Sequence, residues 1–156
     1  MKNDTEQNIK VIVFALQNEE YALSVDYVGA IERIHPITRI PHTVDYVKGV
    51  INLRGVIIPI IDLRLRFGME ATELTDENRM IIVHLNDMQV GLIVDAANDV
   101  IDITKDAIEP PPEVIGSVEV NYIEGVAKIG KRLLILLNLS EVLDSEIQSK
   151  LSSLEG

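Results

Sequence analysis

The stretch KGVINLRGVIIPIIDL, residues 48–63, decides the fold class. Two almost wholly apolar runs, 47–53 and 56–63, flank the pair Arg54 and Gly55, and such runs on either side of a turn are typical of a β-hairpin. Periodicity cannot separate so apolar a run from a short buried helix. The length of the runs and the turn residues that bound them favour strands.

Three further hairpins are predicted from the same pattern. Their apolar runs are 10–16 with 21–25, 80–85 with 90–94, and 126–129 with 132–139. Ile occurs 22 times and Val 17 times, a quarter of the 156 residues, and β-branched side chains favour sheet over helix. Pro59 cannot donate a hydrogen bond to a neighbouring strand, so its strand is expected at a sheet edge or with a bulge there.

Two helices are predicted in this otherwise all-β chain. A C-terminal helix is expected over 145–156, where Ser145 and Gln148 fit a capping box. A second and briefer helix is expected over 26–34, because three apolar residues are spaced to face inward. These three residues are Val28, Ile31 and Ile34.

The chain carries a weak internal repeat. Residues 11–26 match residues 80–95 at an offset of 69, and residues 46–67 match residues 122–143 at an offset of 76. Each half would then be a hairpin, a short turn or helix, and a second hairpin, which suits a small closed barrel. Chance similarity between apolar strands is the alternative. The sequence leaves open whether strands are exchanged between subdomains of about 9–78 and 79–144.

Composition excludes several classes of function. The chain has 25 acidic and 14 basic residues, a net charge of −11, so a nucleic-acid partner would be repelled. It has no Cys, which removes disulfides and thiolate sites. No apolar run approaches the ~20 residues that span a bilayer, and the N-terminus is polar. The sequence therefore predicts a soluble, cytoplasmic protein without membrane insertion.

No residue pattern predicts catalysis, a metal or a cofactor. The three histidines, His35, His42 and His84, lack the spacing of metal ligands. Residues 125–132 read GVAKIGKR, close to a phosphate-binding loop, but a strand is expected to follow instead of a helix. A hairpin turn is the better interpretation of that segment. Nucleotide binding is the competing hypothesis, and a thermal shift with ATP and magnesium would test it.

Arg54 is the one candidate binding residue that the pattern itself singles out. It stands at the tip of a hairpin with apolar flanks, where it is either a solvated turn residue or an anchor for a partner. Gly49 and Gly55 lie on either side of it along the chain. They are expected to supply backbone angles that other residues resist, or close approach of chains.

Three segments together resemble the CheW family of bacterial chemotaxis coupling proteins. They are 14–23, 48–63 with its Asn-Leu-Arg-Gly turn, and 91–100. The resemblance runs over about 9–143. It implies two five-stranded, SH3-like barrels packed side by side in a CheW-like domain of 9–150, followed by the C-terminal helix.

The resemblance implies a non-enzymatic adaptor without cofactors. Its partners would be the cytoplasmic tip of methyl-accepting chemoreceptors and the regulatory domain of the histidine kinase CheA, at membrane receptor clusters. A module of a larger CheV-type protein is the alternative, which the end of the chain at Gly156 argues against. The resemblance assigns no kinase-contacting residues.

Four receptor-binding residues follow from the resemblance, on a surface in the groove between the barrels: Arg54, Val28, Met80 and Val100. Arg54 can pair with a receptor carboxylate through two hydrogen bonds. Met80 is a flexible side chain suited to helix docking. Val28 and Val100 follow matching hairpins of the two halves. They could therefore line a shared groove or simply pack in the core, and the sequence favours neither.

Two positions depart from the family pattern. Members often carry an acidic residue where Ala30 stands, so a polar contact there is either lost or taken over by Glu32. Many members have Pro where Val44 stands, so the approach to Gly49 is expected to differ in shape.

Overall fold

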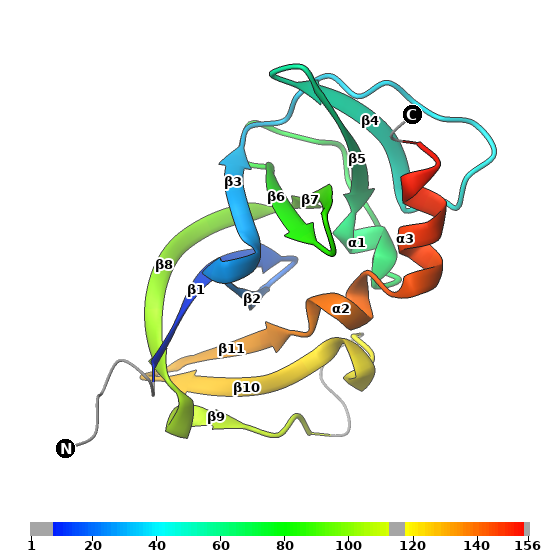
Figure 1. Cartoon of the computed structure of the whole chain (residues 1–156). Helices are drawn as coiled ribbons and strands as arrows, with labels where there is room; N and C mark the ends of the chain where they lie inside the picture. Colours follow the sequence, from blue (N-terminus) through cyan, green and yellow to red (C-terminus); the bar gives the residue numbers. More distant parts are fainter. Residues whose placement is uncertain (1–7, 113–117, 155–156) are drawn as a thin grey trace.

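The chain forms two β-sheets that pack against each other in this computed structural model, which describes residues 8–112 and 118–154 (Figure 1). We call the sheets, as oriented in Figure 1, the upper and lower barrels. The upper barrel has the strand order β3 (Val28–Glu32), β6 (Arg79–Leu85), β7 (Met88–Val94), β5 (Val56–Asp62), β4 (Val47–Leu53). The lower barrel has the order β8 (Ala96–Thr104), β1 (Asn8–Leu16), β2 (Glu19–Ser24), β11 (Arg132–Leu137), β10 (Ile123–Ile129), β9 (Ile108–Glu109).

Helical segments are short and few among the described residues. They are the 3-10 turns η2 (Val25–Tyr27), η3 (Lys105–Ala107) and η4 (Val120–Tyr122) and the α-helices α1 (Leu63–Arg66), α2 (Leu139–Val142) and α3 (Ser145–Ser152). The predicted fold class, all-β with two small barrels packed side by side and a short C-terminal helix, is confirmed. The upper sheet has the five strands predicted, and the lower sheet has a sixth, the two-residue strand β9.

All four predicted hairpins are present. They are the antiparallel pairs β1–β2, β4–β5, β6–β7 and β10–β11. The last of them ends earlier than predicted, because β11 stops at Leu137 and Leu139 already opens α2.

The two barrels exchange hairpins. The first hairpin, β1–β2, pairs with β8 and β11 in the lower barrel, whereas the strands that follow it along the chain, β3 to β5, lie in the upper barrel. The hairpin β6–β7 does the reverse, pairing with β3 and β5. Neither barrel is therefore a continuous segment of the chain, and a division near residue 78 follows neither sheet.

Backbone hydrogen bonds repeat in the two halves. The amide of Asp62 donates to the carbonyl of Tyr46 over 2.8 Å, and the amide of Asn138 donates to the carbonyl of Tyr122 over the same distance. These residues are 76 positions apart, as in the sequence repeat, and Asp62 and Asn138 are the N-caps of α1 and α2. The weak sequence repeat is thus matched by equivalent structure.

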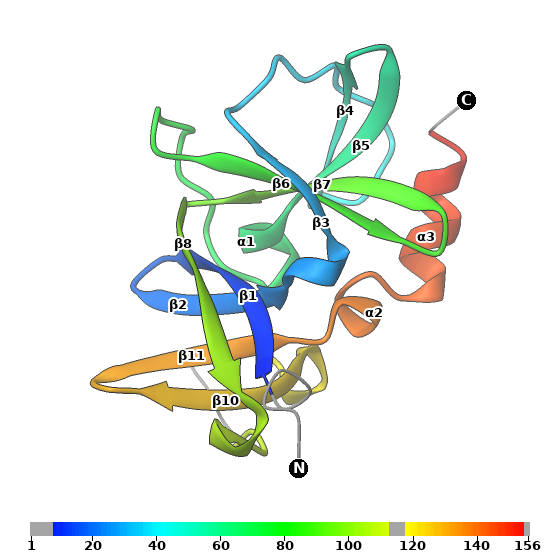
Figure 2. The ribbon, with the colours of Figure 1, turned by 60° about the vertical axis from the view of Figure 1, so that its left-hand side comes forward.

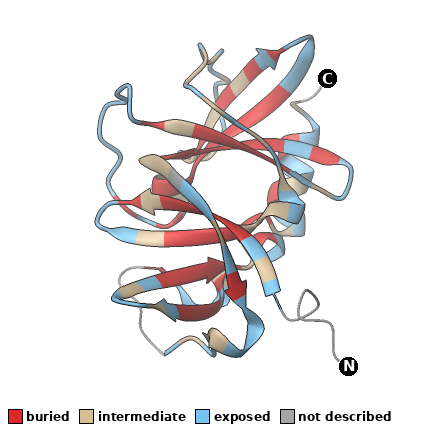
Figure 3. Cartoon of the chain, turned by 90° about the vertical axis from the view of Figure 1, so that its left-hand side faces the viewer, coloured by how far each residue is buried: buried red, intermediate tan, exposed pale blue. Residues whose placement is uncertain are grey.

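Apolar side chains are buried on both faces of most strands (Figure 3). One cluster fills the interface between the barrels, and each barrel has a smaller cluster of its own. Neighbouring residues of one strand alternate between them: Ile60 lies in the upper barrel's cluster and Ile61 in the central one. This two-sided burial explains why the strands read as unbroken apolar runs.

Pro59 lies in a strand that is not at the edge of its sheet, so that part of the prediction is wrong. The parallel pairing of β5 with β7 begins only at Ile60. On the other side, Val50 exchanges its backbone hydrogen bonds with Thr38 and leaves none for Pro59. The missing N–H is harmless because no neighbour requires it.

The predicted helix over 26–34 is also wrong. A single 3-10 turn, η2, is followed at once by the extended strand β3, which pairs with β6. The spacing of Val28, Ile31 and Ile34 fits a helix as well as a strand with an irregularity. Long-range pairing with β6 decides between them, and the register shift between Val28 and Ala30 supplies that irregularity.

The C-terminal helix α3 begins one residue earlier than the predicted capping box. Its N-cap is Asp144, whose carboxylate accepts a hydrogen bond of 3.0 Å from the amide of Ile147. The Gln148 side chain donates instead to the carbonyl of Leu143. Ile147 and Leu151 are buried in the central cluster, so the helix packs against the junction of the barrels.

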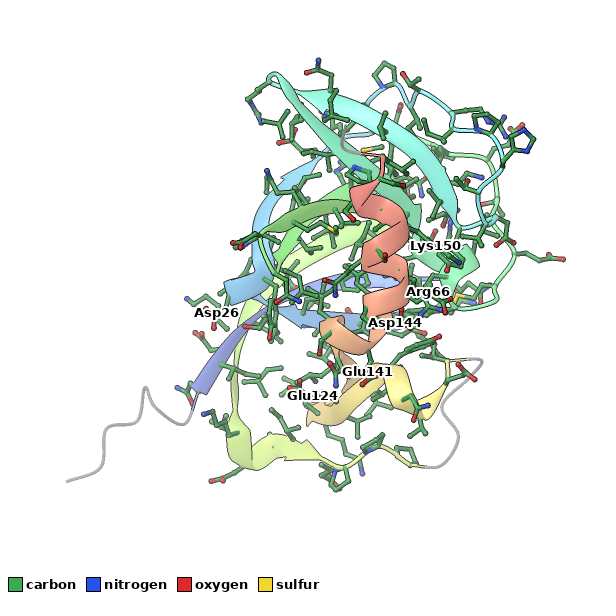
Figure 4. The ribbon with its side chains drawn as sticks, turned by 45° about the vertical axis from the view of Figure 1, so that its right-hand side comes forward. Asp26, Arg66, Glu124, Glu141, Asp144 and Lys150 are labelled. Atoms are coloured by element: carbon green, nitrogen blue, oxygen red, sulfur yellow. The ribbon has the colours of Figure 1, made fainter. Side chains whose placement is uncertain are left out.

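Arg66 at the end of α1 ties the two barrels together (Figure 4). Its guanidinium lies over the rings of Tyr46 and Tyr122, 5.3 Å and 4.6 Å from their centres. It also donates hydrogen bonds to the Tyr122 hydroxyl and to the carbonyl of Val142, at 2.6 Å and 3.0 Å. One side chain of the upper barrel therefore holds both η4 and α2 of the lower part.

Candidate functional site: a groove between the barrels

Strands β3 and β8 are edge strands of the upper and the lower sheet (Figure 2), and residues of both line a shallow groove between the barrels. It contains a hollow of about 210 Å³. The side chains that line this hollow are Ile12, Ile31, Arg79, Ala97, Asp99 and Val100.

Two of these apolar side chains are unusually open to solvent. Ile31 on β3 is 40% exposed and Val100 on β8 is 51% exposed. They are 69 positions apart, as in the sequence repeat, and face equivalent partners, Ile81 and Ile12. The groove therefore presents the same apolar position from each half of the chain.

Val28 lies on the same strand as Ile31 but is half-buried. It stands opposite Val83 of β6 and packs against the central cluster, so only part of its side chain faces outward. The structure brings Val28 and Val100 to strands on opposite sides of the groove.

Met80 is not available at the groove surface, which corrects its placement there. Its side chain is 0% exposed and belongs to the interior cluster of the upper barrel, with Ile58 and Ile82 among its neighbours in the cluster. Its backbone stands opposite Glu32 of β3. The side chain points inward, so Met80 supports the strand that forms one wall of the groove.

Arg54 lies at the tip of the β4–β5 hairpin, with 74% of its side chain exposed. Its one ion pair among the described residues is with Glu32 at the end of β3, over 3.4 Å. Glu32 also contacts His35 at 3.3 Å. The guanidinium is thus next to the groove wall yet largely free to meet another molecule.

The glycines near Arg54 have different roles. Gly49 has φ 141°, and a Cβ there would collide with the backbone carbonyl oxygen of Thr38, so the glycine permits close approach of that segment. Gly55 has φ 87° in an open turn with free space around its Cα. Arg54 itself has φ 51°, a conformation that non-glycine residues seldom adopt.

An ion-pair network fixes the rim of the groove on the lower barrel. Arg132 donates two hydrogen bonds of 3.0 Å and 2.9 Å to the carboxylate of Glu20 and lies 3.5 Å from Asp99, which lines the groove. The hydrogen bonds to Glu20 and Asp99 raise the pKa of Arg132 above its usual value. This network keeps Arg132 charged and holds the Asp99 carboxylate in place.

Of the six residues that line the hollow, sequence reasoning named only Val100 and missed Ile12, Ile31, Arg79, Ala97 and Asp99. Ile31 could have been found, because the repeat relates it to Val100. Arg79 could not, since its guanidinium is held locally by the carbonyls of Asp76 and Asn78 at 2.6 Å and 2.8 Å. Glu32, in contrast, was named as a replacement for an acidic residue at position 30, and it pairs with Arg54.

In the part of the chain that the structure describes, there is neither a cluster of metal-ligating side chains nor a helix directly after the glycine-lysine segment. Within residues 8–112 and 118–154, no three His, Asp or Glu side chains are grouped so that they could hold a metal ion. Gly130 has φ 61° in the turn between β10 and β11, and strand β11 follows it. The glycine-lysine segment is therefore a hairpin turn, as predicted.

A larger hollow of about 410 Å³ lies on a different part of the surface, between α3 and the segment before β4. It is lined by apolar side chains including Val44 and Leu151. None of the predicted receptor-binding residues contributes to it.

Comparison with known proteins agrees with the fold. The family model of the CheW-like domain matches residues 10–147. The chemotaxis protein CheW of Bacillus subtilis (strain 168) is 45% identical over 137 residues, which cover 88% of each chain. The protein of the same name from Klebsiella aerogenes is 38% identical over 135 residues, covering 86% of this chain and 81% of that one.

A solved structure has the same fold. The scaffolding protein TtCheW from Thermoanaerobacter tengcongensis superimposes with a TM-score of 0.81 at 38% identity, over 89% of this chain and 90% of that one. Among the described residues, no helix is long and apolar enough to cross a bilayer. The solved relative is described as a scaffolding protein, and the CheW family is one of scaffolds and not of enzymes. This chain belongs to the CheW family of chemotaxis scaffold and coupling proteins.

Proposed function

We propose that this chain couples methyl-accepting chemoreceptors to the histidine kinase CheA as a non-enzymatic adaptor. The observation that carries the receptor part is the groove between β3 and β8, with exposed apolar side chains next to a largely exposed arginine. Membership of the CheW family supports the same role. The site of action would be the cytoplasmic tip of membrane-bound receptors.

The groove suits the apolar face of a helix. Ile31 and Val100 present equivalent branched side chains from two strands, and Val28 adds a partly exposed surface on the same wall. An amphipathic helix binds such a groove through apolar side chains spaced three or four residues apart. The receptor tip would supply that helix.

Arg54 would supply a polar anchor at the edge of this contact. Its pair with Glu32 spans 3.4 Å and is open to solvent on the arginine side, and exposed pairs of this kind contribute about 0–1 kcal/mol. A receptor carboxylate can therefore replace or join Glu32 at little cost. A guanidinium binds a carboxylate through two parallel hydrogen bonds, which also fixes the orientation of the helix.

The kinase would bind outside the groove, at exposed strand ends of the barrels. A single contact of modest strength is sufficient there, because several linked contacts in an array increase the overall affinity. Receptor and kinase would then bind the same chain at once.

The decisive experiment compares two charge reversals on equivalent hairpins. Arg54→Asp changes the β4–β5 tip, and Lys131→Asp makes the same charge change at the exposed β10–β11 tip of the other barrel. Co-sedimentation with purified receptor tips and, separately, with the kinase regulatory domain measures both partners. Losing a binding hot spot costs about 2 kcal/mol or more, so we expect Arg54→Asp to weaken receptor binding at least ~30-fold.

The melting temperature should stay near the parent value in both variants, because both sites are exposed turns. Kinase binding should survive Arg54→Asp, because Arg54 stands beside the groove and the kinase would bind outside it. Lys131→Asp should also leave receptor binding unchanged. If Arg54→Asp binds the receptor tips as the parent does, Arg54 is only a turn residue and the groove is not the receptor site.

A further inference from the structure

A further hollow, separate from the groove, is lined by residues of the lower barrel and of the 3-10 turn η2. Its volume is about 290 Å³, and its floor is formed by apolar side chains of β1, β2 and β11. Two exposed carboxylates border it, Asp26 of η2 and Glu124 of β10, and Figure 4 labels both. The remaining lining residues are Ile9, Val11, Ala22, Ser24, Tyr27, Leu136 and Leu137.

Neither carboxylate has a charged partner within residues 8–112 and 118–154. In the described part of the chain, no Lys, Arg or His forms an ion pair with Asp26 or Glu124, and neither side chain accepts a hydrogen bond. Two negative charges therefore stand unopposed beside an apolar surface, an arrangement that favours a ligand with a cation on an apolar stem.

The upper barrel shows what fills the equivalent position. The repeat relates Asp26 to Asp95, and there a guanidinium is present: the Nη1 of Arg64 lies 3.4 Å from the Asp95 carboxylate. The same guanidinium is 2.9 Å from Asp62, and only 3% of the Arg64 side chain is exposed. The hydrogen bond to Asp62 is the main cause that raises the pKa of Arg64 above its usual value.

In the lower barrel, the backbone after β11 matches the backbone after β5, but no arginine stands at the position of Arg64. At the offset of 76, Arg64 corresponds to Ser140, whose hydroxyl donates to Asn138 over 2.8 Å just as Arg64 donates to Asp62. A serine is too short to reach the hollow. In the upper barrel, Lys48 and Arg64 line the same hollow. The repeat places Glu124 where Lys48 stands, so the hollow of the lower barrel is the more acidic of the two.

We propose that this hollow binds an arginine side chain presented by a partner protein. The aliphatic stem would lie on Ile9, the half-buried member of the apolar lining. The guanidinium would pair with Asp26 as Arg64 pairs with Asp95, and Glu124 would add a second negative charge at the rim. Arginine fits better than lysine, because its planar head donates several hydrogen bonds to a carboxylate and can stack on the exposed ring of Tyr27.

A protein partner is the occupant that the charge distribution favours. The chain carries a net charge of −11, which attracts a basic surface, and the hollow is open enough for a side chain entering from outside. The proposal does not depend on receptor coupling, since the hollow and the groove share no lining residue.

Titration of the full-length chain with argininamide, followed by backbone amide NMR, tests the proposal. We expect saturable shifts centred on Ser24, Asp26 and Leu137, and weaker binding of lysinamide. The double variant Asp26→Asn/Glu124→Gln should weaken argininamide binding at least tenfold.

The matched control is Asp87→Asn/Glu77→Gln, which makes the same charge change at exposed positions away from the hollow and should bind as the parent does. Shifts spread over all acidic surfaces, or equal weakening in both double variants, would mean unspecific attraction of a cation and overturn the proposal. Absence of saturable shifts at the hollow would overturn it as well.

A second variant tests the comparison with the upper barrel. Ser140→Arg places a guanidinium where Arg64 stands in the other half, and it should occupy the hollow, raise the melting temperature and prevent argininamide binding. The rise should disappear when Asp26→Asn is added. A Ser140→Arg protein that binds argininamide as well as the parent would refute the equivalence on which the proposal is built.

Discussion

The burial of Met80 leads to a quantitative prediction that separates a core residue from a binding residue. Met80→Ala removes three side-chain heavy atoms from the interior cluster of the upper barrel, where the side chain is 0% exposed. Truncation of buried Met to Ala typically costs 2–5 kcal/mol, and we expect about 3 kcal/mol here because strands enclose the site and limit its collapse. For a chain of this size, that loss lowers the melting temperature by about 6–12 °C.

Urea unfolding followed by circular dichroism, together with calorimetry, measures this loss. Val100→Ala is the control: it removes two carbons from a half-exposed side chain and should change the unfolding free energy by less than about 0.5 kcal/mol. Co-sedimentation with receptor tips completes the comparison. Val100→Ala should weaken that binding, whereas Met80→Ala, measured below its melting temperature, should not.

The reverse result would refute the reasoning. If Met80→Ala changes the free energy of unfolding by less than about 1 kcal/mol and yet loses receptor binding, the side chain reaches the groove and does not belong to the interior cluster.

Three more predictions concern stability. Gly49→Ala should cost more than about 2 kcal/mol in urea unfolding, because φ 141° and the adjacent carbonyl both exclude a Cβ. Arg66→Met should cost about 2–4 kcal/mol, since it removes charged hydrogen bonds to Val142 and Tyr122, and calorimetry should then show a broadened transition if the barrels separate. Burial, reinforced by Glu19, raises the pKa of Tyr21 above its usual value, so folding favours the neutral phenol. The contribution of Tyr21 to the free energy of unfolding is fully present below pH ~10 and is lost as the pH rises further, at up to ~1.4 kcal/mol per pH unit. In urea unfolding above pH ~10, the stability of Tyr21→Phe should therefore depend less on pH than that of the parent.

The hairpins and the repeat could be predicted because their signals are local. Each hairpin has turn residues between two apolar runs, and the pair Asp26 and Asp95 survives in both halves. Strand β3 could not be predicted, because its apolar spacing also fits a helix. Pairing with β6, which lies about fifty residues further along the chain, determines its conformation.

The candidate site was predictable only in part, for a related reason. Arg54 stands out because a charge interrupts an apolar hairpin, and the structure leaves it exposed. Met80 and Ile31 do not differ in any local signal that tells inside from outside, since strands with two buried faces show no alternation. Only the assembled barrels reveal that Met80 points inward and Ile31 outward.

The hairpin exchange between the barrels has a consequence for shorter forms of the protein. A fragment holding one repeat would carry a hairpin of one sheet and three or four strands of the other sheet, so it cannot close either of them alone. Two such fragments can complete each other by the mutual swapping seen in intertwined homodimers. The present chain has the architecture of such a dimer whose two copies have been joined end to end. Its two halves should therefore unfold in one cooperative transition.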